Sequence, residues 1–176
     1  MRMAPERMNP LPSSYYYAGG QKIDLHKDDD YVGVDRRLAP AGLIAGLAAV
    51  FDGAPQLPGG IVVATKSLIG SSAMASLQDA GATRPVFRRG GALMVALPEV
   101  RVEMDDATQR RAVEDLLADK AHGMVVKEDS DGRLLLTPAS GSSVDALRMA
   151  NKIFEDAHPA SSSVRFVQFV PKPDVR

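Results

Sequence analysis

The stretch that decides the fold is EVRVEMDDATQRRAVEDLLADKAHGMVVKEDSDGRLLLTP, residues 99–138. It opens with apolar residues at Val100, Val102 and Met104, separated by charged ones. Apolar and polar residues that alternate in this way are typical of a strand with one buried face. The stretch therefore begins with a strand whose other face meets solvent.

A helix and a strand hairpin follow this strand in the same stretch. Asp105 or Asp106 is placed to accept backbone N–H groups at the start of the helix, and Gly123 is placed to end it. The apolar runs 124–126 and 134–136 then predict two strands, joined by an acidic turn. We expect strand, helix, strand, strand in that order.

Downstream residues complete the unit with a second helix and a last strand. Ser142 or Ser143 is expected to begin the helix, and the strand is expected from Val164 to Val170. The predicted inward face of the helix consists of Val144, Leu147, Ala150 and Phe154. Strand–helix–strand–strand–helix–strand is the ferredoxin-like order, an antiparallel four-stranded sheet covered on one face by two helices.

Residues 31–88 offer a degenerate version of the same order. The predicted elements are a strand at 31–35, a helix from Pro40, a β-branched central strand at 61–64, a helix capped by Ser71 or Ser72, and an extended piece at 84–87. The third strand of this unit would have to lie near Lys66–Ile69. Upstream, a tyrosine run at 15–17 and a Gly-Gly turn predict a small β-hairpin.

The chain is therefore predicted to be an α+β protein with two tandem ferredoxin-like units preceded by a β-hairpin. By residue range, we expect a flexible leader at 1–14, the hairpin and the first, degenerate unit at 15–90, the second unit at 91–170, and an extended tail at 171–176. The 176 residues are enough for two small domains.

Composition excludes several classes of function. The chain has no cysteine, which rules out disulfide scaffolds, cysteine-ligated zinc, iron–sulfur clusters and cysteine hydrolases. Lys and Arg total 21 against 22 Asp and Glu, so no basic excess favours nucleic acid. The basic cluster Arg84, Arg88 and Arg89 is interpreted as a solvated strand end.

Neither a membrane nor an RNA partner is expected. The first ten residues are charged and broken by proline, unlike a signal peptide, and the apolar run 38–51 is too short to span a bilayer. We expect a cytoplasmic protein. A ferredoxin-like sheet can stack RNA bases on exposed aromatic residues, but the strands at 98–104 and 133–137 have none; Phe166 and Phe169 lie on opposite faces of the last strand.

Nothing in the sequence assembles a catalytic or metal site. The run Ile69–Ala75 is similar to the segment around the nucleophilic serine of subtilisin-like proteases, but such a serine needs a histidine base. His26, His122 and His158 lie in no segment that supplies one, and His122 is interpreted as a cationic helix C-cap. Neither acidic turn, at 28–30 or at 129–132, has the ligand spacing of a calcium loop. We predict a protein that is not an enzyme, with no metal and no cofactor.

Three stretches together resemble the N-terminal propeptide-like regions of bacterial subtilisin-family serine proteases. They are YYYAGGQKIDL at 15–25, PVFRRGG at 85–91, and the helix DALRMANKIFE at 145–155 with the strand VRFVQFVP at 164–171. The family's usual ending, Val-Glu-Phe-Ala-x-Pro-Asn, is altered here. No catalytic domain is present in the 176 residues, so a freestanding propeptide-like protein is expected.

The resemblance implies ferredoxin-like units that pack the open face of a sheet on the protease and assist its folding. It also implies that the segment after the last strand enters the substrate cleft. In this chain that segment consists of Val170, Pro171, Lys172, Pro173, Asp174, Val175 and Arg176. Its two prolines stiffen it and reduce the ordering cost on binding.

The predicted function is a protein-binding module that inhibits, or helps to fold, a subtilisin-like protease in trans. One alternative is an adaptor that uses a sheet edge to bind an unrelated protein. Another is a regulatory domain that binds a small ligand. Association with a second copy of the chain stays open at this stage.

Overall fold

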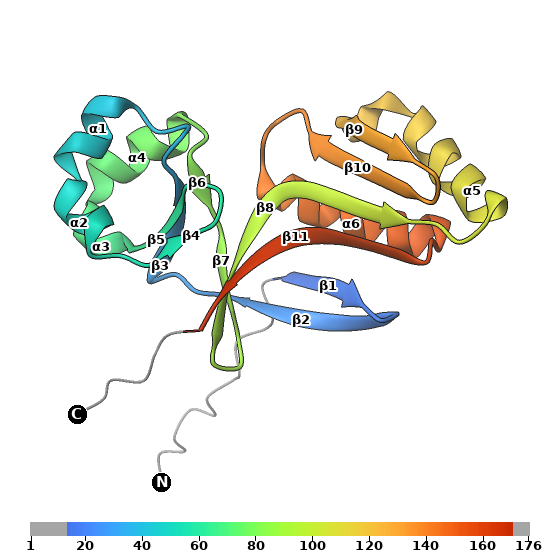
Figure 1. Ribbon diagram of the computed structural model, residues 1–176, viewed down its shortest axis with the longest axis horizontal. Helices are drawn as coiled ribbons and strands as arrows, with labels where there is room; N and C mark the ends of the chain where they lie inside the picture. The colour runs from blue at the N-terminus through green and yellow to red at the C-terminus, as the bar shows by residue number, and fades with distance from the viewer. Residues whose placement is uncertain (1–13, 171–176) are drawn as a thin grey trace, which may run out of the picture.

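The computed structural model describes residues 14–170, which form two α+β units side by side (Figure 1). The elements are, in chain order, β1 (Ser14–Ala18), β2 (Gln21–Lys27), β3 (Tyr31–Asp35), α1 (Ala41–Gly46), α2 (Ala48–Asp52), β4 (Gln56–Leu57), β5 (Ile61–Thr65), α3 (Lys66–Ile69), α4 (Ser71–Asp79), β6 (Thr83–Arg84), β7 (Val86–Arg89), β8 (Ala92–Glu103), α5 (Ala107–Ala118), the 3-10 helix η1 (Lys120–His122), β9 (Met124–Ser130), β10 (Arg133–Pro138), α6 (Ser143–Ala157) and β11 (Ser161–Phe169).

The C-terminal sheet has the strand order β11-β8-β10-β9, and all its neighbouring strands are antiparallel. The alternation predicted for its first strand is confirmed, because Val100 and Val102 are fully buried while Arg101 and Glu103 are exposed. Both helices, α5 and α6, bury apolar residues against the same core as these valines. In Figure 1, α6 lies behind the strands, so the other face of the sheet is turned toward the viewer.

Strand β8 is longer than predicted because it serves two sets of neighbours. Its first residues pair with β7 and its last with β10, while β11 runs along both parts. Pro98 lies between the two parts, where none of these registers includes a partner for it. A proline has no N–H to donate, so it is tolerated where the ladder is interrupted.

The helix starts of this unit confirm the predicted caps. Asp106 accepts the N–H of Gln109 at 2.8 Å, and Ser142 accepts that of Asp145 at 3.2 Å. The predicted inward position of Val144 is wrong, because its side chain is exposed. The buried stripe of α6 consists of Ser143, Ala146, Leu147, Met149, Ala150, Asn151, Ile153 and Ala157. Val144 therefore lies on the outer side of the first turn.

The N-terminal sheet has the order β4-β5-β3-β6, again with antiparallel neighbours. The third strand, which would have had to lie near Lys66–Ile69, is not there, because those residues form α3. The strand missing from the prediction is β4, which pairs Gln56 and Leu57 with β5 inside the Pro/Gly connector. A two-residue strand has too little alternation to leave a pattern in the sequence.

Four short helices cover one face of this sheet around Phe51 and Leu77, which are fully buried. The single helix predicted from Pro40 is interrupted at Leu47, which separates α1 from α2. The serine cap predicted for α4 is also wrong: Gly70 is the N-cap, with φ +85°. Glycine adopts this left-handed conformation without steric cost.

The β1–β2 hairpin is present as predicted, but it packs against the C-terminal unit. Tyr16 and Leu25 are buried in the same core as α5, α6 and β8. β2 also pairs with β7 through His26 and Lys27, which joins the hairpin to the edge of the sheet. Two segments far apart in sequence therefore complete one core.

A third apolar cluster fills the junction between the units. It contains Ile61 and Val63 of β5, Val86 of β7, and Leu93 and Val95 of β8. β5 is thus buried on both faces, which explains its continuous β-branched sequence. The second face of the N-terminal sheet is consequently covered by the start of β8.

Gly33 on β3 allows the two units to approach closely at this junction. A Cβ atom at this position would lie 2.8 Å from Cγ1 of Val95 and 3.1 Å from Cβ of Arg84.

The prediction of an α+β protein is confirmed. The structure combines helices with sheets whose paired strands are antiparallel.

Candidate functional site

The predicted binding segment starts where β11 ends. Val170 follows Phe169 directly, and its side chain is 66% exposed. Pro171–Arg176 lie outside the described residues. Phe169 pairs with Leu93 and packs against the junction cluster, so the chain leaves β11 beside the boundary between the units (Figure 1).

The face of the C-terminal sheet opposite its helices is a charged surface, which we call the open face. It comprises Glu99, Arg101 and Glu103 of β8, Arg133, Leu135 and Thr137 of β10, and Ser161, Ser163 and Arg165 of β11. The register places Leu135, Arg101 and Ser163 in one row across the three strands. The arginine side chains on this face are about half exposed.

Ion pairs link the charged residues of the open face. Glu99 lies 3.8 Å from Arg101 and 3.5 Å from Arg165, and Arg133 lies 3.3 Å from Glu103. Solvent-exposed pairs of this kind contribute about 0–1 kcal/mol each. They therefore set the charge pattern of the surface more than its stability.

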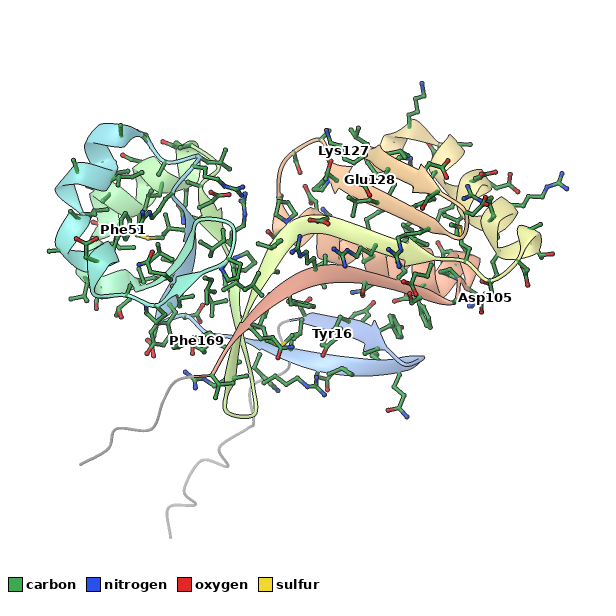
Figure 2. All side chains as sticks on the ribbon, viewed as in Figure 1. Tyr16, Phe51, Asp105, Lys127, Glu128 and Phe169 are labelled. Carbon is green, nitrogen blue, oxygen red and sulfur yellow. The ribbon has the colours of Figure 1, made fainter. Side chains whose placement is uncertain are left out.

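Strand β9 forms the edge of this sheet, and two valines on it are exposed. Val125 and Val126 are 42% and 51% exposed, and every residue of β9 after Met124 is exposed. An edge strand presents unpaired backbone groups that another chain can pair with. Lys127, Glu128 and Asp129 follow the valines, and charges on an edge oppose unspecific pairing. Figure 2 labels Lys127 and Glu128 on this strand.

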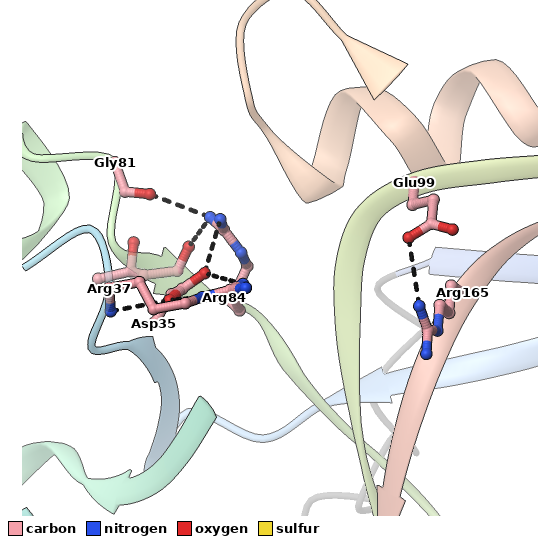
Figure 3. Close-up of polar contacts among 7 residues, drawn as sticks. Asp35, Arg37, Gly81, Arg84, Glu99 and Arg165 are labelled. Atoms are coloured by element: carbon pink, nitrogen blue, oxygen red, sulfur yellow. Dashed lines mark hydrogen bonds and ion pairs between the residues drawn. The ribbon is translucent and has the colours of Figure 1, made fainter. Parts of the chain in front are cut away.

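An ion cluster of the buried Asp35 and Arg84 and the exposed Arg37 lies on the N-terminal unit, across the junction from Glu99 and Arg165 (Figure 3). Arg37 donates from Nε and Nη2 to the Asp35 carboxylate at 3.1 and 2.9 Å. Arg84 Nη2 lies 3.9 Å from the same carboxylate. Burial opposes the ionisation of Asp35, but the hydrogen bonds from Arg37 and the charges of Arg37 and Arg84 outweigh it, so the pKa of Asp35 lies below its ordinary value.

A groove of about 340 Å³ runs between this cluster and the open face. Asp35, Arg37 and Arg84 line one side, and Glu99 and Arg165 line the other. The groove is thus bounded by charges of both signs. It extends the open face toward the N-terminal unit.

The basic cluster predicted to be solvated is held by partners. Arg84 is only 5% exposed, and its Nη1 donates to the carbonyls of Gly81 and Thr83 at 3.0 Å. Arg88 forms an ion pair with Asp28 at 2.7 Å, and Arg89 donates to the hydroxyl of Tyr16 at 2.7 Å. The interpretation as a solvated strand end is wrong for Arg84, because the pairing of β6 with β3 carries it into the junction.

Two of the histidines are placed at helix ends. Nδ1 of His122 accepts the N–H of Met124 at 2.8 Å, and Nε2 lies 2.7 Å from the Leu117 carbonyl. The ring therefore bonds a carbonyl in the last turn of α5, which fits the capping role expected of His122. His158 ends α6 in the left-handed conformation, with φ 49°. Among residues 14–170, no three His, Asp or Glu side chains are grouped so that they could hold a metal ion.

The tyrosines of the hairpin anchor it to α6. The hydroxyl of Tyr15 donates to Oε1 of Glu155 at 2.6 Å and that of Tyr17 at 3.2 Å. The Tyr17 ring stacks on Phe154 with centroids 4.3 Å apart. The hydrogen bond to Glu155, followed by burial and the charge of Glu155, raises the pKa of Tyr15 to about 12. The tyrosine run therefore has a packing role that the sequence does not reveal.

Comparisons with protein families, with curated proteins and with solved structures gave no match. Within the described part of the chain, no helix has both the length and the apolar content needed to cross a membrane. The candidate site consists of the open face, the groove beside it and the end of β11.

Proposed function

We propose that the chain is a non-enzymatic, propeptide-like module that binds a subtilisin-family serine protease in trans, as an inhibitor or folding helper. The observation that carries the proposal is the strand order β11-β8-β10-β9 with both helices on one face. This is the order expected of a ferredoxin-like unit. It supports the resemblance because it leaves one sheet face exposed and leads β11 into the segment at 170–176.

The N-terminal unit supports the same arrangement in a reduced form. The order β4-β5-β3-β6 matches the order β9-β10-β8-β11 of the C-terminal sheet when the strands of each unit are numbered along the chain. The second face of this smaller sheet is buried in the junction cluster. A partner that docks on a sheet face is therefore expected on the C-terminal unit.

The charge pattern of the open face indicates what the partner surface must offer. Arg101, Arg133 and Arg165 outnumber Glu99 and Glu103, so a complementary surface carries more acidic than basic groups. Charge complementarity of this kind acts on the association rate and on specificity more than on raw affinity. The extended segment after Phe169 would add backbone pairing in the substrate cleft, as an added strand does.

Calorimetric titration of the full chain with a subtilisin-family protease tests the proposal, using a protease whose nucleophilic serine is replaced by alanine. We expect a one-to-one complex. The double variant Arg101→Glu with Arg165→Glu should weaken it by about tenfold or more, which corresponds to about 1.4 kcal/mol. Arg111→Glu, on the exposed side of α5, changes charge away from the face and should leave binding unchanged. If the native chain, the double variant and Arg111→Glu bind the protease with equal affinity, the open face is not part of the interface.

A second candidate function is an adaptor that pairs through the edge strand β9. The exposed Val125 and Val126 favour it, because apolar side chains on an unpaired edge suit strand addition. Val126→Asp separates the two candidates. It should abolish binding to an adaptor partner and leave protease binding intact.

A further inference from the structure

A second cavity, distinct from the groove beside the open face, lies between the two units. Its volume is about 350 Å³, which falls within the range of about 300–1,000 Å³ typical of small-molecule sites. The N-terminal unit contributes Lys66 and Arg84, and the C-terminal unit contributes Ser142 and Ser143 at the start of α6. In Figure 1, the loop that leads into α6 faces the N-terminal unit.

The lining of this cavity is basic. Lys66 and Arg84 contribute two cationic side chains, and none of the described residues that line it is acidic. Lys66 has no carboxylate within 4.0 Å among residues 14–170. A cavity with this charge balance favours a negatively charged occupant.

Arg84 provides the observation that points to a ligand. Its side chain is more than nine-tenths buried, and its Nε has no hydrogen-bond partner. Its nearest counter-charge, Asp35, is already held at shorter distance by Arg37. Burial, which the charge of Asp35 only partly offsets, lowers the pKa of Arg84. Arg84 is thus a buried cation whose counter-charge lies 3.9 Å away and is shared with Arg37. Burying a cation with so incomplete a pairing is costly, and an anion in the adjoining cavity would offset that cost.

The start of α6 adds a second source of positive potential. α6 has 15 residues, and the first N–H groups of a helix have no acceptor within the helix. Ser142 takes the N–H of Asp145, whose carboxylate is bound by Ser140 and Arg148 and lines a different cavity. Ser143 and Val144, the first residues of α6, line the cavity, so the helix start adds positive potential on this side, as at helix starts that bind phosphate.

We propose that this cavity binds a small phosphate dianion, either inorganic phosphate or the phosphate group of a small monoester. Lys66 and the first turn of α6 would contact the phosphate from opposite units. The buried Arg84 would add positive charge at the wall of the cavity. The ligand would then link the two units. This site is separate from the proposed protease-binding face and does not depend on it.

Isothermal titration at low ionic strength with inorganic phosphate, and separately with glycerol phosphate, tests the proposal on the full chain. We expect one site per chain and an unfolding temperature that rises with phosphate concentration. Tighter binding of glycerol phosphate would identify a monoester as the ligand, and tighter binding of inorganic phosphate would identify the free ion.

Two variants test the geometry without removing the buried arginine. Lys66→Met removes one cation, and Ser142→Asp keeps a good N-cap residue while placing a carboxylate in the cavity. Each should weaken phosphate binding by about tenfold or more. Lys127→Met, on the edge strand β9, is the matched control and should bind like the native chain.

The proposal is overturned if neither phosphate compound binds at millimolar concentration, or if Lys127→Met weakens binding as much as Lys66→Met. Melting curves without phosphate show whether each variant is folded. A folded Ser142→Asp variant that binds phosphate normally would also overturn the placement at α6.

Discussion

Replacing Gly33 by alanine tests how closely the two units are packed. Gly33 lies on β3, opposite Val63 of β5 and Arg84 of β6. The added Cβ would meet Cγ1 of Val95 at 2.8 Å and the Arg84 carbonyl oxygen at 3.3 Å. Non-bonded carbons prefer a separation of about 3.5–4.0 Å. The substitution therefore forces β3 and β8 apart by several tenths of an ångström or more.

The expected loss follows from two opposing effects. Overpacking a buried site costs about 1–3 kcal/mol, and Val95 is fully buried, so it has no solvent to move into. Replacing glycine by alanine also restricts the unfolded chain, which returns about 0.4–1 kcal/mol. We expect Gly33→Ala to lower the free energy of unfolding by about 1–2 kcal/mol. For a chain of this length, each kcal/mol corresponds to about 2–4 °C in melting temperature.

Urea unfolding followed by far-UV circular dichroism measures this loss, and two further variants sharpen it. Gly42→Ala is the matched control, because a Cβ there has no neighbour within 4 Å and alanine favours the helix. Adding Val95→Ala to Gly33→Ala removes the clashing methyl groups, so the two changes together should cost less than their sum. A Gly33→Ala protein as stable as the native chain would refute the close approach of β3 and β8.

Three further predictions concern single contacts. The folded state lowers the pKa of Asp35 below its unfolded value of about 3.9, so its stabilisation is present above that pH and is lost as the pH falls through the folded-state value. Urea unfolding at several pH values should therefore show that the free energy of unfolding of Asp35→Asn falls less steeply toward low pH than that of the native chain. Tyr15 should ionise with a pKa of about 12 in absorbance titrations, and Glu155→Gln should move it toward 10. Ser142→Ala should lose about 1 kcal/mol of unfolding free energy.

The C-terminal unit could be predicted from sequence because each of its elements leaves a local signal. Alternation in β8, a capping aspartate at Asp106 and the stripe of α6 are all short-range patterns. The prediction failed where packing against other elements, and not a local pattern, decides the structure. Val144 has the apolar character of a core residue but lies outside the stripe, and β4 is too short for any period to show.

The junction between the units could not be predicted because its residues have partners far away in sequence. Arg84 was expected in solvent, and only the pairing of β6 with β3 carries it to Asp35, 49 positions earlier in the chain. The same holds for the hairpin, whose Tyr15 finds Glu155 on α6. Propensity and periodicity describe neighbours in sequence, and they carry no information on such contacts.

Steady-state inhibition of a subtilisin-family protease tests the proposed function most directly. The full chain should inhibit the protease in competition with substrate, because the segment after Phe169 would occupy the cleft. A chain that ends at Phe169 should still bind through the open face but should no longer block hydrolysis. A full chain that neither slows hydrolysis nor forms a complex at micromolar concentration would contradict the account.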